Sequence, residues 1–364
     1  MLSDQTLRFL TKRLSSLRNF NPALLSVIMF LNILRYLQTS ERMDMQDMTS
    51  GKLDELRNLV APILSEDAMS EAARKALLKD LIKMREHEKG SRSGDDIEDV
   101  HQMRVATRRM RSIFQLLGEY FKARPVEQYQ LGLRKVARAL GEVRDLDVMI
   151  DNLTRFQETL SPEDQAALSK PITILSDRRA AERKKLVSAL DKKDYAHFVA
   201  DFTQFVSTAG AGARALSKTD GAPTEVRHIL PVTIYEHLAS VRAYDRALKD
   251  ADDETLHLLR IEFKRLRYLL SIFEEVLGKA GKDFGEELKL LSDHLGSLQD
   301  AVVAQTRLRD LLPKLDDGEK AVLELYMGTL ANEYTGLRAS FPDAWKRFNT
   351  RAVQRQLGSA ISGL

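Results

Sequence analysis

Apolar residues recur along most of this chain with the spacing of one face of an α-helix. This periodicity predicts helices over residues 70–88, 160–191, 224–248, 283–311 and 319–339, over stretches beginning at His101, Pro125 and His257, and in a terminal piece around Trp345. Ser70 and Ser161 stand where helix caps are expected, and Pro171 predicts a bend or break. A polar break is expected at residues 90–94. No strand pattern of comparable length competes, so we predict an all-α protein.

One stretch of this pattern occurs twice. HQMRVATRRMRSIFQLLGEYF begins at His101, and HLLRIEFKRLRYLLSIFEEVLG begins at His257. Without a gap, the comparison matches His101 with His257, Arg104 with Arg260, Arg108 with Lys264, Arg109 with Arg265, and Arg111 with Arg267. Further on, Leu140-Gly141 aligns with Leu295-Gly296, and Asp145 with Asp300. The sequence therefore predicts an internal repeat of at least two helices and their junction.

Each copy predicts a helix with an apolar face and a cationic face. At about 100° per residue, positions i, i+3, i+7 and i+10 fall within a sector of roughly 80°. The basic residues at these positions form a first row of His101, Arg104, Arg108 and Arg111, and a second row of His257, Arg260, Lys264 and Arg267. The expected core residues are Met103, Ala106, Met110, Ile113, Phe114 and Leu117 in one copy, and Leu259, Phe263, Leu266, Leu270 and Phe273 in the other. Arg109 and Arg265 flank the rows.

Two interpretations of these rows compete. A single cationic face is commonly solvated, or paired with carboxylates of a neighbouring helix. However, no carboxylate lies between His101 and Arg111, and an uncompensated cationic row attracts an external anion. Two internal copies could share a core without sharing their surface residues, so the recurrence of the basic residues favours anion binding. We expect Asp145 and Asp300 to be helix caps or salt-bridge partners rather than catalytic groups.

Composition narrows the possible classes of function. The chain has 364 residues and no cysteine, which excludes disulfides, thiolate metal sites and a cysteine nucleophile. Its formal net charge of +3 does not suggest a polyanion partner, but the charges are unevenly distributed. Between Arg104 and Arg144 the acids are Glu119, Glu127 and Glu142, against many more bases, Arg138 among them. Arg179 and Arg183 in residues 160–191 either extend this cationic surface or face solvent.

Changes in composition along the chain indicate its domain organisation. Residues 1–60 read as an N-terminal helical extension, whose apolar run is too short and interrupted for a bilayer span of roughly 20 residues. Residues 61–206 and 224–364 are the expected first and second halves of a helical domain. They are joined by a linker at residues 207–223, where Gly, Ala, Ser and Thr dominate.

The paired motifs resemble those of the conserved histidine α-helical domain (CHAD) family. The residues that carry the resemblance are His-x-x-Arg-Val-x-x-Arg-Arg-x-Arg-Ser at His101, His-x-x-Arg-Ile-x-x-Lys-Arg-Leu-Arg-Tyr at His257, and the Leu-Gly pieces at Leu140 and Leu295. The resemblance implies two antiparallel helical bundles related by pseudo-twofold symmetry, and a cationic surface that binds inorganic polyphosphate. It also implies a cytoplasmic binding module that associates with polyphosphate-processing enzymes or granule proteins.

On this basis we expect a non-catalytic polyphosphate-binding protein without a cofactor. The expected ligand-binding residues are His101, Arg104, Arg108, Arg109, Arg111, Arg138, Arg179, Arg183, His257, Arg260, Lys264, Arg265 and Arg267. Neither histidine has a second histidine or a carboxylate three or four residues later, so we expect no metal site. Each histidine is expected to bind phosphate or a backbone group.

The same basic residues leave other functions open. A nucleic-acid-binding protein would use such rows too, although Tyr268 is the only aromatic residue placed to stack on a base, with Ser112 in the matching position. A scaffolding protein could use the cationic surface for an acidic partner. An enzyme is the least supported class, because the chain has no Gly-x4-Gly-Lys-Ser/Thr phosphate loop.

Overall fold

The computed structural model describes residues 53–214 and 223–364. Residues 59–364 form one compact unit, to which α3 and all later helices belong. The predicted N-terminal extension lies almost entirely outside the described residues, as do residues 215–222 of the predicted linker. Within the described residues the regular elements are all helical, apart from two isolated β-bridges, and the all-α prediction is confirmed.

The helices before the linker are α3 (Met69–Glu86), α4 (Glu88–Ser93), α5 (Ile97–Leu117), α6 (Ala123–Gln157), α7 (Pro162–Leu190) and α8 (Lys193–Ser207). Those after it are α9 (Val226–Arg242), α10 (Asp253–Ile272), α11 (Glu274–Arg309), α12 (Asp317–Phe348) and α13 (Arg351–Ser362). Short 3-10 helices occupy Gly118–Tyr120, Ala247–Asp250 and Leu312–Lys314. The two copies of the sequence repeat thus fall on α5 and α6, and on α10 and α11. A twofold relation between the halves stays a prediction.

Several helix ends follow from local sequence, and others differ from the prediction. The Ser161 side chain caps α7 by accepting from the Asp164 N–H, as predicted. Ser70 is not a cap, because α3 already begins at Met69 and its N-cap residue is Ala68. The expected polar break at residues 90–94 is largely helical, as part of α4, and the chain leaves it at Gly94 with φ of +68°. No break occurs at Pro171, which lies inside α7.

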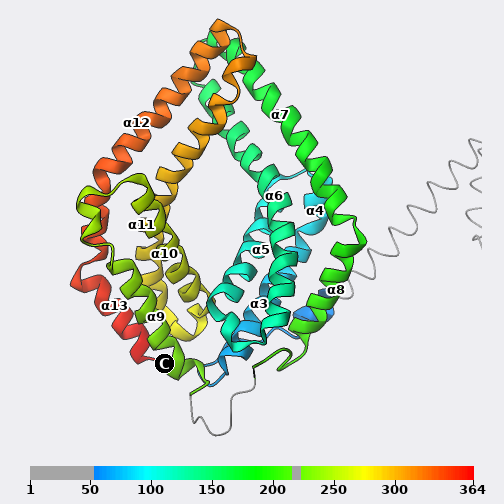
Figure 1. Cartoon of the computed structure of the whole chain (residues 1–364), viewed down its shortest axis with the longest axis vertical. Coiled ribbons are helices and arrows are strands. Elements are labelled where there is room, and N and C mark those ends of the chain that lie inside the picture. Colours follow the sequence, from blue (N-terminus) through cyan, green and yellow to red (C-terminus); the bar gives the residue numbers. More distant parts are fainter. Residues whose placement is uncertain (1–52, 215–222) are drawn as a thin grey trace, which may run out of the picture. The chain divides into compact units, whose positions relative to one another are not determined.

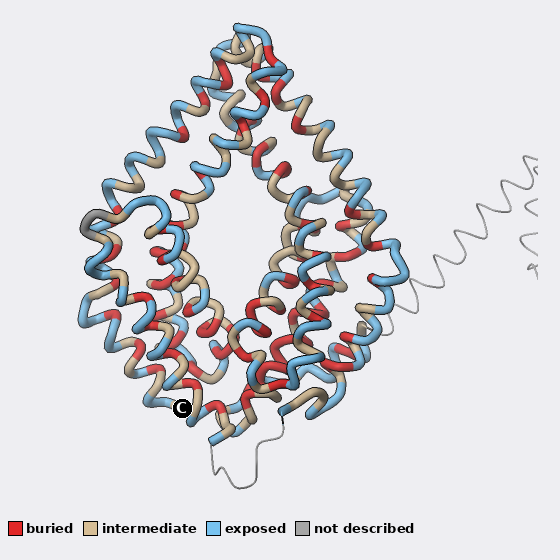
Figure 2. Tube along the Cα trace, viewed as in Figure 1, coloured by how far each residue is buried: buried red, intermediate tan, exposed pale blue. Residues whose placement is uncertain are grey.

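The predicted core faces of both repeated helices are buried. In α5, Met103, Met110 and Ile113 have no exposed surface, and in α10 the same holds for Leu259 and Phe263. The other core residues predicted for the two copies are at most 4% exposed. The apolar periodicity therefore predicted correctly which face of each helix is buried. In Figure 2, buried residues concentrate where α3, α5 and α6 run together. It follows that the first row lies away from the buried face of α5, and the second row away from the buried face of α10.

The segments before and after the linker meet at several places, among them α3 with α9. The helices α5 and α10 contact each other, and so do α7 and α12. Figure 1 shows α6 beside α7 and α11 beside α12, with all four converging at one end. At that end Leu153, Leu168, Leu311 and Leu323 are completely buried in one apolar cluster. These contacts fix α5 and α10 relative to each other, and so fix the distance between the two rows.

Candidate functional site

The contact between α5 and α10 brings members of the two rows around one aromatic ring. The guanidinium carbon of Arg108, on α5, lies 5.9 Å from the centroid of the Tyr268 ring, and that of Arg267, on α10, lies 5.7 Å from it. Both distances are within the range of cation–π attraction. We name Arg108, Arg260, Lys264 and Arg267, together with Tyr268, the central cluster.

Lys264 shows how strongly the charges of this cluster interact. Burial, reinforced by repulsion from Arg260 and Arg108, lowers the pKa of the Lys264 ammonium to about 8. Burial also lowers the pKa of Arg260, partly opposed by Asp300. Asp300 offers little compensation, because its closest oxygen is 3.9 Å from Arg260 and its side chain is 79% exposed. Arg267 also donates to the exposed Asp293 at 3.2 Å. Two exposed carboxylates thus face four cations, and the central cluster carries excess positive charge in a partly desolvated place.

In the first row, Arg104 is paired with a carboxylate. Arg104 donates to Asp145 of α6 at 2.9 Å, and Arg307 of α11 donates to the second oxygen of the same carboxylate at 2.8 Å. Asp145 is thus a salt-bridge partner, one of the two predicted roles. It lies in the middle of α6 and is not a helix cap. This shared carboxylate neutralises part of the charge beside the first row.

The remaining members of the first row lie close to bases on α6. Burial lowers the pKa of His101, with Arg144 adding repulsion, and burial with repulsion from Arg134 does the same for Arg111. Arg134, Arg138 and Asp145 share one face of α6 at spacings of four and seven residues. Arg138 therefore lies on the face of α6 that meets the first row.

Sequence reasoning did not include Arg134, Arg144 and Arg307 among the site residues. For Arg134, the helical spacing from Arg138 was a usable signal, because both precede Asp145 on one face of α6. No comparable signal marks Arg307, which meets Asp145 from a distant part of the chain.

The two flanking arginines already have acidic partners. Arg109 donates to Asp80 at 2.9 Å and to the Ser271 hydroxyl at 2.8 Å, and the Asp80 side chain is only 2% exposed. Arg265 is exposed and pairs with Glu262 on its own helix. Arg109 thus holds α5 against α3 and α10, and a phosphate ligand would have to compete with a buried carboxylate for it.

The predicted site residues on α7 also have internal partners. Arg179 forms an ion pair with Asp147 of α6, whose side chain is fully buried. Arg183 donates to the backbone carbonyl of Arg92 at 3.0 Å. In the second row, Nδ1 of His257 lies 2.8 Å from the Gln299 side-chain oxygen. The structure thus does not bring Arg179 and Arg183 into the central cluster, and their contact with a ligand stays a prediction.

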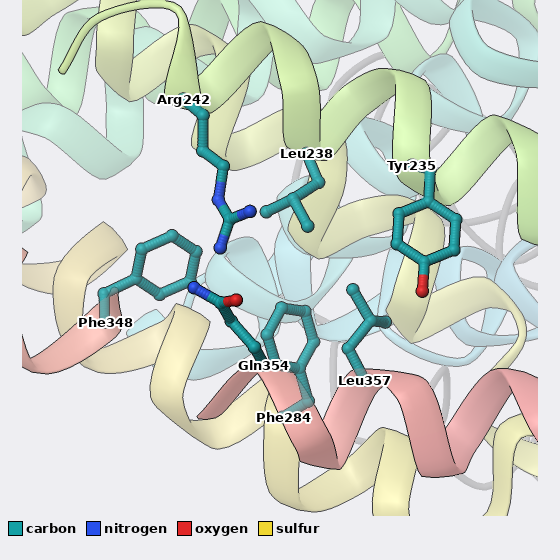
Figure 3. Close-up of a pocket in the computed structure, with 7 residues that line it drawn as sticks. All are labelled: Tyr235, Leu238, Arg242, Phe284, Phe348, Gln354 and Leu357. Carbon is teal, nitrogen blue, oxygen red and sulfur yellow. The ribbon is translucent and has the colours of Figure 1, made fainter. Parts of the chain in front are cut away.

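A small pocket lies apart from both rows. It is lined by Tyr235, Leu238 and Arg242 of α9 and by side chains of α11, α12 and α13, with Phe284 and Leu357 among its walls (Figure 3). Its volume of about 130 Å³ is below the several hundred Å³ usual for small-molecule sites. None of the row residues lines it, so we place the candidate site on the cationic surface instead.

Comparison with known proteins identifies the family. Residues 75–309 match the model of the CHAD domain. The chain belongs to the CHAD domain family. Two uncharacterized proteins of Mycobacterium tuberculosis, from strains CDC 1551 and H37Rv, are 30% identical to it over 217 residues, which is 59% of this chain. The match spans only 40% of the length of each of those relatives.

Solved structures share the fold of this CHAD protein. The CHAD domain from the plant Ricinus communis superposes with a TM-score of 0.63 at 21% identity, covering 82% of this chain and 94% of that one. PptA from Streptomyces chartreusis gives a TM-score of 0.58 at 15% identity, covering 77% and 99%. Among the described residues of this CHAD protein, none of the helices is apolar over a length sufficient to traverse a bilayer.

Proposed function

We propose that this CHAD protein binds inorganic polyphosphate as a non-catalytic module, with the central cluster at the middle of its binding surface. The observation that carries the proposal is the meeting of Arg108 and Arg267 at the Tyr268 ring, with the half-buried Lys264 on the same face of α10. Burial and the neighbouring cations lower the pKa of Lys264 to about 8. Such an arrangement is unfavourable in the unliganded protein and becomes favourable when an anion is bound. Holding a half-buried lysine among other cations lowers the stability of the unliganded protein, and such groups are typical of functional sites.

A chain of phosphates suits this surface chemically. The planar guanidinium of arginine can bind two phosphate oxygens at once, and lysine adds a mobile point charge. The central cluster supplies Arg108, Arg260, Lys264 and Arg267. Arg111 follows Arg108 by one turn of α5, and Arg138 lies on the face of α6 that meets the first row. A linear polyanion could contact both groups, whereas a single phosphate could contact only a few of these residues.

Nucleic acid is the second candidate, and one observation disfavours it. Single-stranded nucleic acids bind strongly where aromatic rings are free to stack on bases. Tyr268 is the tyrosine of the central cluster, and both Arg108 and Arg267 lie against its ring. Stacking on a base would have to displace these two guanidinium groups.

A non-catalytic role is part of the proposal. A phosphate-cleaving enzyme would require a carboxylate free to act as a base or to hold a metal ion near the cations. Asp145, close to the first row, is instead held by Arg104 and Arg307. Asp145 therefore supports a structural role. Asp300, which is 79% exposed and 3.9 Å from Arg260, is not held in this way, so an assay of phosphate release from polyphosphate tests the non-catalytic role.

A competition titration tests the proposal. Purified protein is titrated with long-chain polyphosphate, single-stranded RNA and ATP at two salt concentrations. We expect polyphosphate to bind most tightly, with log K falling against log salt with a slope of about −4 if roughly six phosphate contacts form. Equal affinity for RNA would favour a nucleic-acid-binding protein. Absence of binding to every polyanion would favour a scaffolding protein.

Two double variants that lose the same charge test where polyphosphate binds, one in the central cluster and the other, the control, outside it. Arg260→Ala with Lys264→Ala removes two cations of the central cluster, and Lys192→Ala with Lys193→Ala removes two exposed lysines at the start of α8. We expect the first pair to lose at least tenfold in affinity and to flatten the salt dependence, because each lost phosphate contact removes about 0.7 from the slope. The second pair is expected to bind like the unaltered protein.

A further inference from the structure

Two hydrogen-bond donors of the central cluster are buried without a partner among the described residues. They are Nε of Arg260 and the hydroxyl of Tyr268. Most buried polar groups in proteins are hydrogen-bonded, and the exceptions are often functional. Both groups belong to α10, and both lie in the cationic surroundings of Lys264.

The helical geometry places these donors on one side of α10. Arg260, Lys264, Arg267 and Tyr268 follow at i, i+4, i+7 and i+8, so they share one face of the helix. Arg108 of α5 and Arg267 both lie against the Tyr268 ring. Both guanidinium groups thus lie within cation–π distance of the ring that carries the hydroxyl.

The two residues of α5 that match Arg260 and Tyr268 have hydrogen-bond partners. Arg104, which matches Arg260 in the sequence repeat, donates to Asp145 at 2.9 Å. Ser112, which matches Tyr268, donates its hydroxyl to the carbonyl of Arg108 at 3.1 Å. Asp300, the residue matching Asp145, is too far from Arg260 for a hydrogen bond, at 3.9 Å. Unfilled donors therefore occur on the α10 side and not at the matching α5 positions.

We propose that Tyr268 and Arg260 form a subsite for one phosphoryl group, in which the Tyr268 hydroxyl and Arg260 Nε each donate to an oxygen of that group. Lys264, Arg108 and Arg267 supply the surrounding charge. This inference rests on the proposed polyphosphate binding and adds a fixed position to it. The α10 side holds one phosphoryl group in defined geometry, and the remaining cations bind the rest of the chain without a fixed position for each phosphate.

Two variants that keep every charge test the subsite. Tyr268→Phe retains the ring, and with it the contacts to Arg108 and Arg267, but removes the hydroxyl. Arg260→Lys retains the positive charge but removes Nε and the planar guanidinium. Because a hydrogen bond to a charged group is stronger than one between neutral groups, we expect each variant to lose about tenfold or more in affinity for polyphosphate. The slope of log K against log salt should stay unchanged, since no charge is lost.

The matched control is Tyr235→Phe, which removes the hydroxyl of an exposed tyrosine on α9. It is expected to bind polyphosphate like the unaltered protein. Thermal unfolding of each variant shows whether it is folded. Since the Tyr268 hydroxyl is buried without a partner, Tyr268→Phe should unfold at an equal or higher temperature. If Tyr268→Phe did not fold, Arg260→Lys would provide the same test.

The outcomes separate this subsite from the proposed function. If the unaltered protein binds polyphosphate and both variants bind equally well, the subsite is wrong and the proposed function stands. A flattened salt dependence in Tyr268→Phe would also overturn the subsite, because the hydroxyl would then act by arranging the charges. If the unaltered protein binds no polyphosphate, the proposed function itself fails.

Discussion

At the scale of single residues, Lys264 links stability to binding. In the unfolded chain its pKa has the ordinary value of 10.5, and in the folded protein burial and nearby cations lower it to about 8. A lowered lysine pKa means that the charged form is disfavoured in the fold, so stability from this group rises as pH increases from about 8 toward 10.5. A bound polyanion has the opposite preference, because it attracts the charged form.

This opposition predicts a loss of polyphosphate affinity as pH rises through about 8, where Lys264 loses its proton. The measurement is a polyphosphate titration at constant salt on either side of that pH. In Lys264→Arg the cation persists, because an arginine side chain stays protonated throughout this range. We expect the variant to bind with little change over the same interval. An equal loss in the variant would assign the pH dependence to another group.

At the scale of helices, α5 combines a buried face and a cationic face in one element. Phe114 is 2% exposed and lies near the rings of Phe121, Tyr129, Phe202 and Phe205, which come from α6, α8 and the segment after α5. This aromatic group fixes the rotation of α5 about its own axis. The direction in which Arg104 and Arg108 point therefore depends on packing on the opposite side of the helix.

The packing role of Phe114 predicts that Phe114→Ala lowers the free energy of unfolding by about 3 to 5 kcal/mol, through the lost burial and the cavity left behind. Urea unfolding followed by circular dichroism measures this loss. Leu131→Ala, at a residue of α6 that is 55% exposed, is the control and should change stability by less than about 0.5 kcal/mol. Similar results for the two variants would mean that α5 is oriented differently from this description.

At the scale of the whole compact unit, Asp145 connects elements from both sides of the linker. Its carboxylate binds Arg104 of α5 and Arg307 of α11, and its own backbone belongs to α6. The three side chains are only about one-third exposed. The same carboxylate that joins these helices also withholds two arginines from an incoming polyanion.

We therefore expect Asp145→Asn to bind polyphosphate more tightly at low salt and with a steeper salt dependence, because up to two arginines become free to contact phosphate. Asp151→Asn is the matched control. It makes the same change in net charge on the same helix, but breaks only the exposed pair with Arg155. Equal effects of the two variants on affinity and slope would show that net charge, and not the release of Arg104 and Arg307, is responsible.

The sequence alone determined the helical class, the core faces of α5 and α10, the cap of α7 and the cationic rows. These features depend on residues a few positions apart, and helical periodicity relates such positions directly. Some local predictions were wrong. Ser70 is not a cap, because α3 begins one residue earlier, at Met69. The repeat placed the two rows in matching positions, but it did not show which of their cations are paired.

Only the tertiary structure decided which cations have a carboxylate partner on another helix. Arg109 meets Asp80, Arg179 meets Asp147, and Arg104 shares Asp145 with Arg307, each across different helices. Arg108 and Arg267 meet at Tyr268 because α5 contacts α10. Charge pairing and burial depend on distances in space between segments far apart in the chain, and the spacing of residues within one helix carries no information about those distances.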